Sequence, residues 1–290
     1  MIELMKYLRL LLLLLLISAC GASKNGIKKS ETKEFDAMAV KLEKEVSYEI
    51  KEDVAVKNIN WKTIQKDSII NIVSDAPKNL HSNWTSILQS NVSDKGAVDY
   101  ANIKKQRDNL NKYIKSLTAY LPAETWSKKE KLAYWINAYN ALTIDLILRN
   151  YPVKSIKDIK EPWNQRLWEF GDKWLNLNDI EHEILRKMDE PRIHFAIVCA
   201  SFSCPKLQNT AFTAKELDNQ LNDATKEFLS DSERNIITKD KLEISKIFKW
   251  FAKDFKTEGS LIDFLNKYSD IDISSKAKKS FLDYNWDLND

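Results

Sequence analysis

The stretch from Lys131 to Asn150, KLAYWINAYNALTIDLILRN, is apolar on nearly every side when drawn as a helix. A helix with one apolar stripe covers the surface of a domain, whereas a helix that is apolar all round lies in its middle. Residues 127–130, Ser-Lys-Lys-Glu, have the form of a capping box that opens this helix, and Pro152 lies beyond its end. The chain is therefore expected to fold around one buried central helix.

Two asparagines, Asn137 and Asn140, interrupt the apolar surface of this helix. A buried side-chain amide without partners costs about 1–3 kcal/mol, so both are expected to be hydrogen-bonded. Either they brace neighbouring loops, or they orient a catalytic group or form part of an oxyanion site. The pattern favours bracing.

The rest of the chain predicts mostly helices and a few strands. One helix is expected over 101–120, and a second begins at Asn178, with Glu181 three residues on, and ends before Pro191. A third follows the cap pair Thr213 and Glu216, and its apolar residues Leu217, Leu221, Ala224 and Phe228 share one face. A strand is expected over 192–200, a hairpin over 235–238 and 242–245, and two or three short helices at the end. Helices and strands that do not alternate regularly favour an α+β fold: a helix-rich single domain with a buried central helix and a small sheet.

Composition excludes several functions. The five glycines in 290 residues exclude glycine-rich phosphate loops. Net charge is +3 with both signs interspersed, so no nucleic-acid partner is expected. No cofactor is expected.

The N-terminal sequence predicts export. Lys6 and Arg9 precede the leucine block LLLLLLLISAC, whose apolar run is too short to span a bilayer, as in a secretory signal peptide. The last four residues of this block, ending in Cys20, look like a bacterial lipobox, which implies cleavage before Cys20 and acylation of its thiol. The mature protein is therefore expected in the cell envelope, anchored to a membrane on its extracytoplasmic side.

Three segments of the chain are expected. Residues 1–19 form the signal peptide, 20–83 a tether with a weakly structured region, and 84–290 the folded domain. Loose alternation over 44–58 is compatible with one or two strands in the second segment.

The segment 192–207, RIHFAIVCASFSCPKL, is the first candidate for chemistry. If its apolar run is a buried strand, His194 and Cys199 lie on opposite faces, roughly 16 Å apart, and cannot act as base and nucleophile. Cys204 leaves the strand in a loop, where a nearby imidazole could activate it as a nucleophile; otherwise it is a small buried hydrophobe. The strand end at 200–205 is expected to border a pocket that His194 and Cys204 face. A Cys199–Cys204 disulfide would require the loop to fold back sharply.

The run Glu181-His182-Glu183 is the second candidate. Acidic residues in the first turn of a helix suit its dipole, while His182 could lie on the surface or turn inward as a base or ligand. Together with His81 and His194 it completes the three histidines of the chain. A zinc site from His182, His194 and the cysteines would match no familiar ligand spacing, so no metal is expected.

A run of aromatic residues lies between the predicted helices. It comprises Trp163, Trp168, Phe170 and Trp174. Tryptophans in a groove stack on sugar rings or apolar ligands, but buried ones more often fill a core, which is the favoured interpretation here.

Together these segments resemble the bacterial and plant family known as domain of unknown function 547. The matching motifs are W-x-N-x-Y-N-A from Trp135 to Ala141, I-E-H from Ile180 with Leu185 and Arg186 after it, R-x-H-F-A-x-x-C-x-x-x-S-C-P from Arg192 to Pro205, and Tyr284, Trp286, Leu288 and Asn289 of Y-D-W-x-L-N. Asn285 replaces the Asp usual in the last motif. The resemblance spans about 84–289 and implies no particular activity.

Two hypotheses follow. In the first, the protein is an envelope hydrolase or transferase that looks distantly like papain and transglutaminase-like enzymes. Cys204 is then the nucleophile, His194 or His182 the base, with Glu181 nearby as a partner, and Asn137 or Asn140 an orienting group. In the second, it is a non-catalytic binding or scaffolding domain whose ligand is an envelope protein, peptide or glycan.

Overall fold

The structure, a computed structural model, describes residues 79–257 and 259–290. The predicted signal peptide, Cys20, the tether and the strands over 44–58 lie outside these residues. Within them, no helix is both long enough and apolar enough to cross a membrane. The described residues belong to one compact unit, an α+β domain rich in helices, as the sequence predicts.

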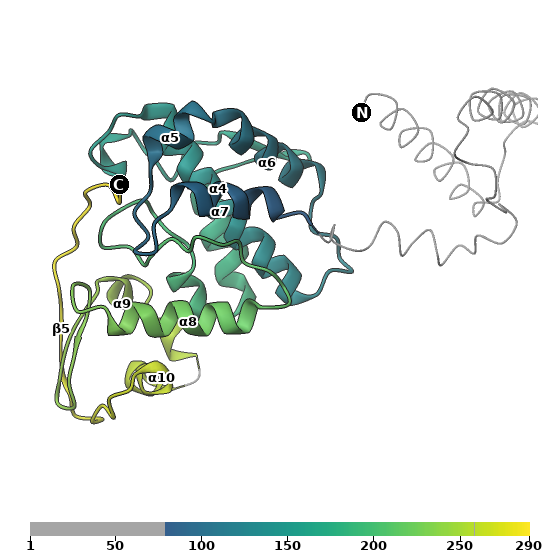
Figure 1. Ribbon diagram of the computed structural model, residues 1–290. Helices are drawn as coiled ribbons and strands as arrows, with labels where there is room; N and C mark the ends of the chain where they lie inside the picture. Colours follow the sequence, from purple (N-terminus) through teal and green to yellow (C-terminus); the bar gives the residue numbers. More distant parts are fainter. Residues whose placement is uncertain (1–78, 258) are drawn as a thin grey trace, which may run out of the picture. The chain divides into compact units, whose positions relative to one another are not determined.

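Four helices make up the first part of the domain. Helices α5 (Tyr100–Lys105) and α6 (Arg107–Ala119) pack against α7 (Lys128–Asn150), and α4 (Ser82–Asn91) packs on α5 and α6 (Figure 1). The single helix predicted over 101–120 is therefore two, which meet at Gln106, the C-cap of α5 and N-cap of α6. The prediction of helical structure was right, but the sequence of this stretch gives no signal for the break at Gln106.

Helix α7 confirms the prediction of a buried central helix. Its N-cap Ser127 and Glu130 form the reciprocal capping box, and every residue from Ile136 to Leu148 is buried. The charged Asp145 in this range accepts hydrogen bonds from Arg107, Arg149 and the indole of Trp168. A carboxylate so deep in the domain is tolerated because its oxygens are bonded to charged and polar donors.

The other elements are all shorter than α7. They are η3 (Ile156–Asp158), β1 (Trp168–Phe170), β2 (Lys173–Leu175), the π-helical turn η4 (Asp179–Ile184), η5 (Leu185–Met188), η6 (Pro191–Phe195), α8 (Leu217–Ser230), β3 (Ile236–Ile237), β4 (Lys241–Ile244), α9 (Ile247–Trp250), η7 (Asp254–Lys256), α10 (Leu261–Tyr268) and β5 (Lys278–Phe281). β1 and β2 form an antiparallel hairpin. The predicted hairpin of β3 and β4 is confirmed, and β5 joins it in parallel, which the sequence did not indicate.

The strand predicted over 192–200 is wrong. Residues 191–195 form the 3-10 helix η6, opened by Pro191 and by Glu190, whose carboxylate accepts the amide of Arg192. The next residues are irregular, and Ala200 has a left-handed φ of 56°. The run is apolar because it lies between two hydrophobic clusters rather than within a sheet: Ile193 packs in one and Phe195 in the other.

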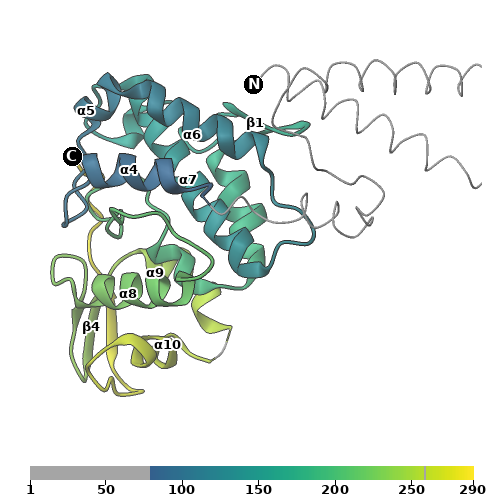
Figure 2. The same ribbon diagram turned by 45° about the vertical axis from the view of Figure 1, so that its right-hand side comes forward.

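These two clusters meet under the C-terminal tail. One lies around α4 to α7, and the other gathers residues of α8, α9, α10 and the β3–β4–β5 sheet. From β5 the tail returns to the first part of the domain, and the C-terminus lies near α5 in both views (Figures 1 and 2). The tail makes bridges from Asp287 to Ser155 and from Leu288 to Ser201. Residues far apart in sequence are thereby brought to the boundary between the clusters.

Candidate functional site

A pocket of about 190 Å³ lies at this boundary and gathers most of the candidate residues. Glu181, His182, His194 and Cys204 line it, as do Cys199 and Pro205, whereas Asn137 and Asn140 are not part of the lining. The predicted pocket beside residues 200–205 is therefore present, although an irregular segment rather than a strand leads to it. Most of the remaining wall is aromatic and comprises Tyr139, Trp163, Trp250, Phe251, Tyr284 and Trp286.

Asn137 and Asn140 brace loops, which is the interpretation that the sequence favours. The amide of Asn140 donates to the carbonyl of Ala196 at 2.9 Å and accepts the N–H of Val198 at 2.9 Å. Asn137 holds both backbone groups of Phe212 in the same way, at 2.7 and 2.9 Å. A side chain of α7 thus supplies the hydrogen bonds that a neighbouring strand would supply to the segment after η6.

Because the segment is not extended, the separation predicted between His194 and Cys199 from strand geometry does not apply. Both residues line the same pocket. The His194 ring stacks on Phe251 with 3.9 Å between ring centres.

An ion-pair network holds His194 in place. Its Nε2 lies 2.8 Å from Oδ2 of Asp254, and Arg186 donates to both oxygens of the same carboxylate, at 2.6 and 2.8 Å. Burial raises the pKa of Asp254, but the hydrogen bonds from Arg186 and His194 outweigh it and hold this pKa well below its ordinary value. Burial lowers the pKa of His194 against the attraction of Asp254. The lowered pKa favours the neutral imidazole at neutral pH, a form that can donate from Nε2 to the Asp254 carboxylate.

His182 belongs to the same network. Arg186 Nη1 lies 2.9 Å from Nδ1 of His182, and because a guanidinium can only donate, Nδ1 is the acceptor. Burial and the charge of Arg186 lower the pKa of His182. The third histidine, His81, lies elsewhere, bonded to the hydroxyl of Tyr113.

Glu181 is the buried carboxyl group of the pocket. The hydroxyl of Tyr139 donates to its Oε2 at 3.0 Å. Burial raises the pKa of Glu181 to about 7, against the opposing effects of Tyr139 and Arg186. The carboxyl of Glu181 therefore exchanges its proton near neutral pH, a property common among groups that bind or transfer protons.

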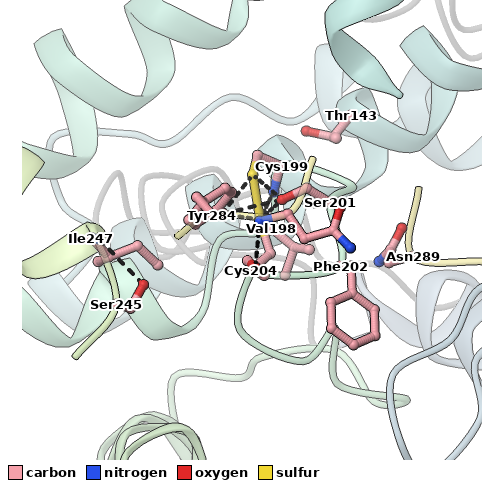
Figure 3. The surroundings of a disulfide bond; sticks show 12 residues. Thr143, Val198, Cys199, Ser201, Phe202, Cys204, Ser245, Ile247, Tyr284 and Asn289 are labelled. Atoms are coloured by element: carbon pink, nitrogen blue, oxygen red, sulfur yellow. Dashed lines mark hydrogen bonds between the residues drawn. A yellow bond between two sulfur atoms is a disulfide. The ribbon is translucent and has the colours of Figure 1, made fainter. Parts of the chain in front are cut away.

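Cys199 and Cys204 are joined in a disulfide, one of the alternatives open from the sequence. The loop folds back through the left-handed Ala200 and a turn in which Cys204 N donates to Ser201 O at 3.0 Å. The hydroxyls of Tyr284 and Ser201 approach the sulfur atoms (Figure 3). With its sulfur in this bond Cys204 is not a free thiol, so its role as a nucleophile stays a prediction for the reduced protein.

Several residues of the site were not candidates in the sequence. Asp254 lies between aromatic residues far along the chain, and no spacing links it to His194. Trp250 and Phe251 give no signal beyond their aromatic character. Tyr284 and Trp286 belong to the last motif of the resemblance, which is the signal that could have placed them at the site.

Two smaller expectations need correction. Asn178 makes no side-chain cap bond; instead Asn176 and Asp179 accept each other's amide N–H, because the turn begins two residues earlier. The aromatic run is only partly core: Trp168 and Phe170 are buried, but Trp163 lines the pocket and Trp174 is 52% exposed.

Elsewhere in the described part of the chain, a larger hollow of about 580 Å³ runs along the α4–α5 connection and contains none of the candidate residues. Within residues 79–257 and 259–290, no three His, Cys, Asp or Glu side chains are grouped as metal ligands.

Comparison with known protein families gives a match over part of the chain. Residues 123–229 match the family described as "Protein of unknown function, DUF547". This segment runs from just before α7 to the end of α8 and includes Glu181, both pocket histidines and the disulfide. Asp254, the partner of His194, lies beyond it, as do the pocket residues of α9 and of the C-terminal tail. No curated protein and no solved structure matches the chain.

Proposed function

We propose that the protein is an envelope lipoprotein whose domain binds a small uncharged ligand in the aromatic pocket. The lipobox-like sequence that ends in Cys20 supports the anchor. Each buried methylene of an acyl chain contributes about 0.8 kcal/mol, so two or more chains such as palmitate hold a soluble domain firmly on a bilayer.

Metabolic labelling tests the anchor. Cells grown with radioactive palmitate should label the wild-type protein but not the Cys20→Ser variant. Equal labelling of both proteins would contradict the anchor, and it would leave the proposal for the pocket untouched.

The observation that carries the binding proposal is the composition of the pocket wall. Six aromatic side chains surround the few polar groups of Glu181, His182 and His194. Binding sites for small molecules commonly have this character, an apolar concave wall with a few polar groups that fix orientation. The volume of about 190 Å³ suits one ring or one side chain rather than a long substrate.

The ligand class follows from these groups. A sugar residue presents apolar C–H faces that stack on indole and phenol rings, and hydroxyls that bond to a carboxyl group. Glu181, protonated below a pKa of about 7, can both donate and accept such bonds without leaving an unpaired charge in the pocket. We therefore propose a glycan unit of the envelope as the ligand.

Titration of the intact protein with soluble envelope-glycan fragments, followed by tryptophan fluorescence and calorimetry, tests this proposal. Binding should be lost in Trp286→Ala and kept in Trp174→Ala, a matched control because Trp174 is exposed on β2 away from the pocket. Absence of binding by the wild type, or equal loss in both variants, would refute it.

A second candidate is the thiol-dependent hydrolase or transferase. The specific observation in its favour is that His194, which is hydrogen-bonded to Asp254, lines the same pocket as Cys204. This function requires the reduced protein. Thiol-dependent ester or amide cleavage that appears on reduction and is abolished by Cys204→Ser, but not by Cys199→Ser, would establish it over binding alone.

A further inference from the structure

The two sulfur atoms of the disulfide have different surroundings. Cys204 Sγ accepts the backbone N–H of Cys199 at 3.0 Å, and the hydroxyls of Ser201 and Tyr284 each lie 3.3 Å from it (Figure 3). Cys199 Sγ contacts the same two hydroxyls, at 3.2 and 3.4 Å, but no backbone amide of the described residues. Since each hydroxyl carries one proton, the amide is the donor that distinguishes Cys204.

These donors favour a negative charge on Cys204. A disulfide sulfur is a weak acceptor, whereas a thiolate is a strong one, so the same hydrogen bonds become stronger when the S–S bond is cleaved. The Arg234 guanidinium adds a positive charge nearby, since its Nε donates to the carbonyl of Cys204 at 2.9 Å, although Asp231 neutralises part of that charge. Cleavage that leaves the thiolate on Cys204 is therefore the favoured direction.

The two sulfurs also differ in access. Cys204 is only 3% exposed, whereas Cys199 is half-buried, and both residues line the pocket. A thiol that enters the pocket reaches Cys199 more easily than Cys204. The more accessible sulfur is thus bonded to the better leaving group.

We propose that Cys199–Cys204 is an exchangeable disulfide that reacts with a low-molecular-weight thiol, with Cys199 as the attacked sulfur and Cys204 as the leaving thiolate. The incoming thiolate forms a bond to Cys199 Sγ while the S–S bond breaks, and the electron pair of that bond stays on Cys204. A second thiolate then attacks the sulfur of the small thiol in this mixed disulfide and releases Cys199. The small thiol is oxidised to its own disulfide and the protein is reduced to a dithiol. In the reverse sequence the protein dithiol reduces the small disulfide to two thiols, and the Cys199–Cys204 bond forms again.

This activity does not depend on the proposed glycan ligand. The disulfide lines the same pocket, so a bound ligand would slow the exchange by blocking access to Cys199. Loss of glycan binding with retained exchange, or the reverse, separates the two proposals.

The first test uses the intact protein with glutathione as the probe. The protein is incubated in millimolar glutathione, quenched with acid, alkylated and digested, and the mixed disulfide is located by mass spectrometry. Glutathione should be found on Cys199 and not on Cys204; the Cys20 peptide is resolved separately. Glutathione on Cys204, on both cysteines equally, or on neither in the folded protein would overturn the proposal.

The second test measures the thiol of Cys204 directly. In Cys199→Ser, the pH dependence of alkylation by iodoacetamide should give a pKa for Cys204 below the ordinary value of about 8.5. Tyr284→Phe in this background removes one donor and should raise that pKa by about one unit, a tenfold change in the thiolate equilibrium. Tyr120→Phe, at an exposed tyrosine outside the pocket, is the matched control and should change nothing.

The charged and titratable groups around this thiol are Tyr284, Arg234 with its ion-pair partner Asp231, and, in the lining of the same pocket, Glu181, His182 and His194. A step near pH 7 in the alkylation profile that disappears in Glu181→Gln would belong to Glu181 and not to Cys204. A pKa of Cys204 at or above its ordinary value, unchanged by Tyr284→Phe, would contradict the proposal. If Cys199→Ser does not fold, the position of glutathione in the wild type decides alone.

Discussion

Replacing Asn140 with alanine tests how the segment that carries the site is held. Asn140 is 3% exposed and bonds to the carbonyl of Ala196 and the amide of Val198, both in buried residues. The substitution leaves two buried backbone groups without partners. Each costs about 1–3 kcal/mol, so the free energy of unfolding should fall by about 2–4 kcal/mol when a water molecule relieves part of this cost.

Denaturation in guanidinium chloride, followed by tryptophan fluorescence and by far-ultraviolet circular dichroism, measures this loss. The two signals should give the same transition, which licenses a single free energy of unfolding. The matched control is Asn150→Ala at the exposed end of the same helix, where the amide donates to Leu146 O. That variant should stay within about 0.5 kcal/mol of the wild type.

A transition of Asn140→Ala that coincides with the control would refute the reasoning. It would mean that the backbone of 196–198 keeps its shape without α7. The shape of the pocket would then depend on packing in the two hydrophobic clusters and not on the hydrogen bonds of the buried Asn140 amide.

Two further predictions concern the pocket. Glu181→Gln should be more stable than the wild type by about 3 kcal/mol above pH 7, and the difference should vanish below pH 4.5. The reason is that folding raises the pKa of Glu181 from its ordinary 4.5 to about 7. Between these two values the folded state holds a proton that the unfolded state has lost, so the stability of the wild type falls as the pH rises. Unfolding curves of both proteins from pH 4 to 8 measure this, and a constant difference would contradict it. Reduction of Cys199–Cys204 should lower the free energy of unfolding by only about 2 kcal/mol, because the cysteines are five positions apart and the bond closes a short loop. Denaturation with and without a phosphine reductant measures this loss. In the control, the double variant Cys199→Ser/Cys204→Ser, the reductant should change nothing.

Local patterns in the sequence determined much of this protein. The capping box at Ser127 and the all-round apolar surface predicted the bounds and the burial of α7, because cap bonds and helical periodicity depend on residues only three or four positions apart. The β3–β4 hairpin was predicted for the same reason. The need of Asn137 and Asn140 for partners also followed from burial alone.

Only the tertiary structure decided the conformation of residues 192–200. An apolar run is compatible with any buried backbone, and here a side-chain amide from α7 satisfies the groups that strand partners would satisfy. The partner of His194 was decided in the same way, since Asp254 is 60 positions away and no local pattern connects them. The pocket itself forms where two hydrophobic clusters meet the returning tail, and long-range packing of this kind leaves no periodic signal in the sequence.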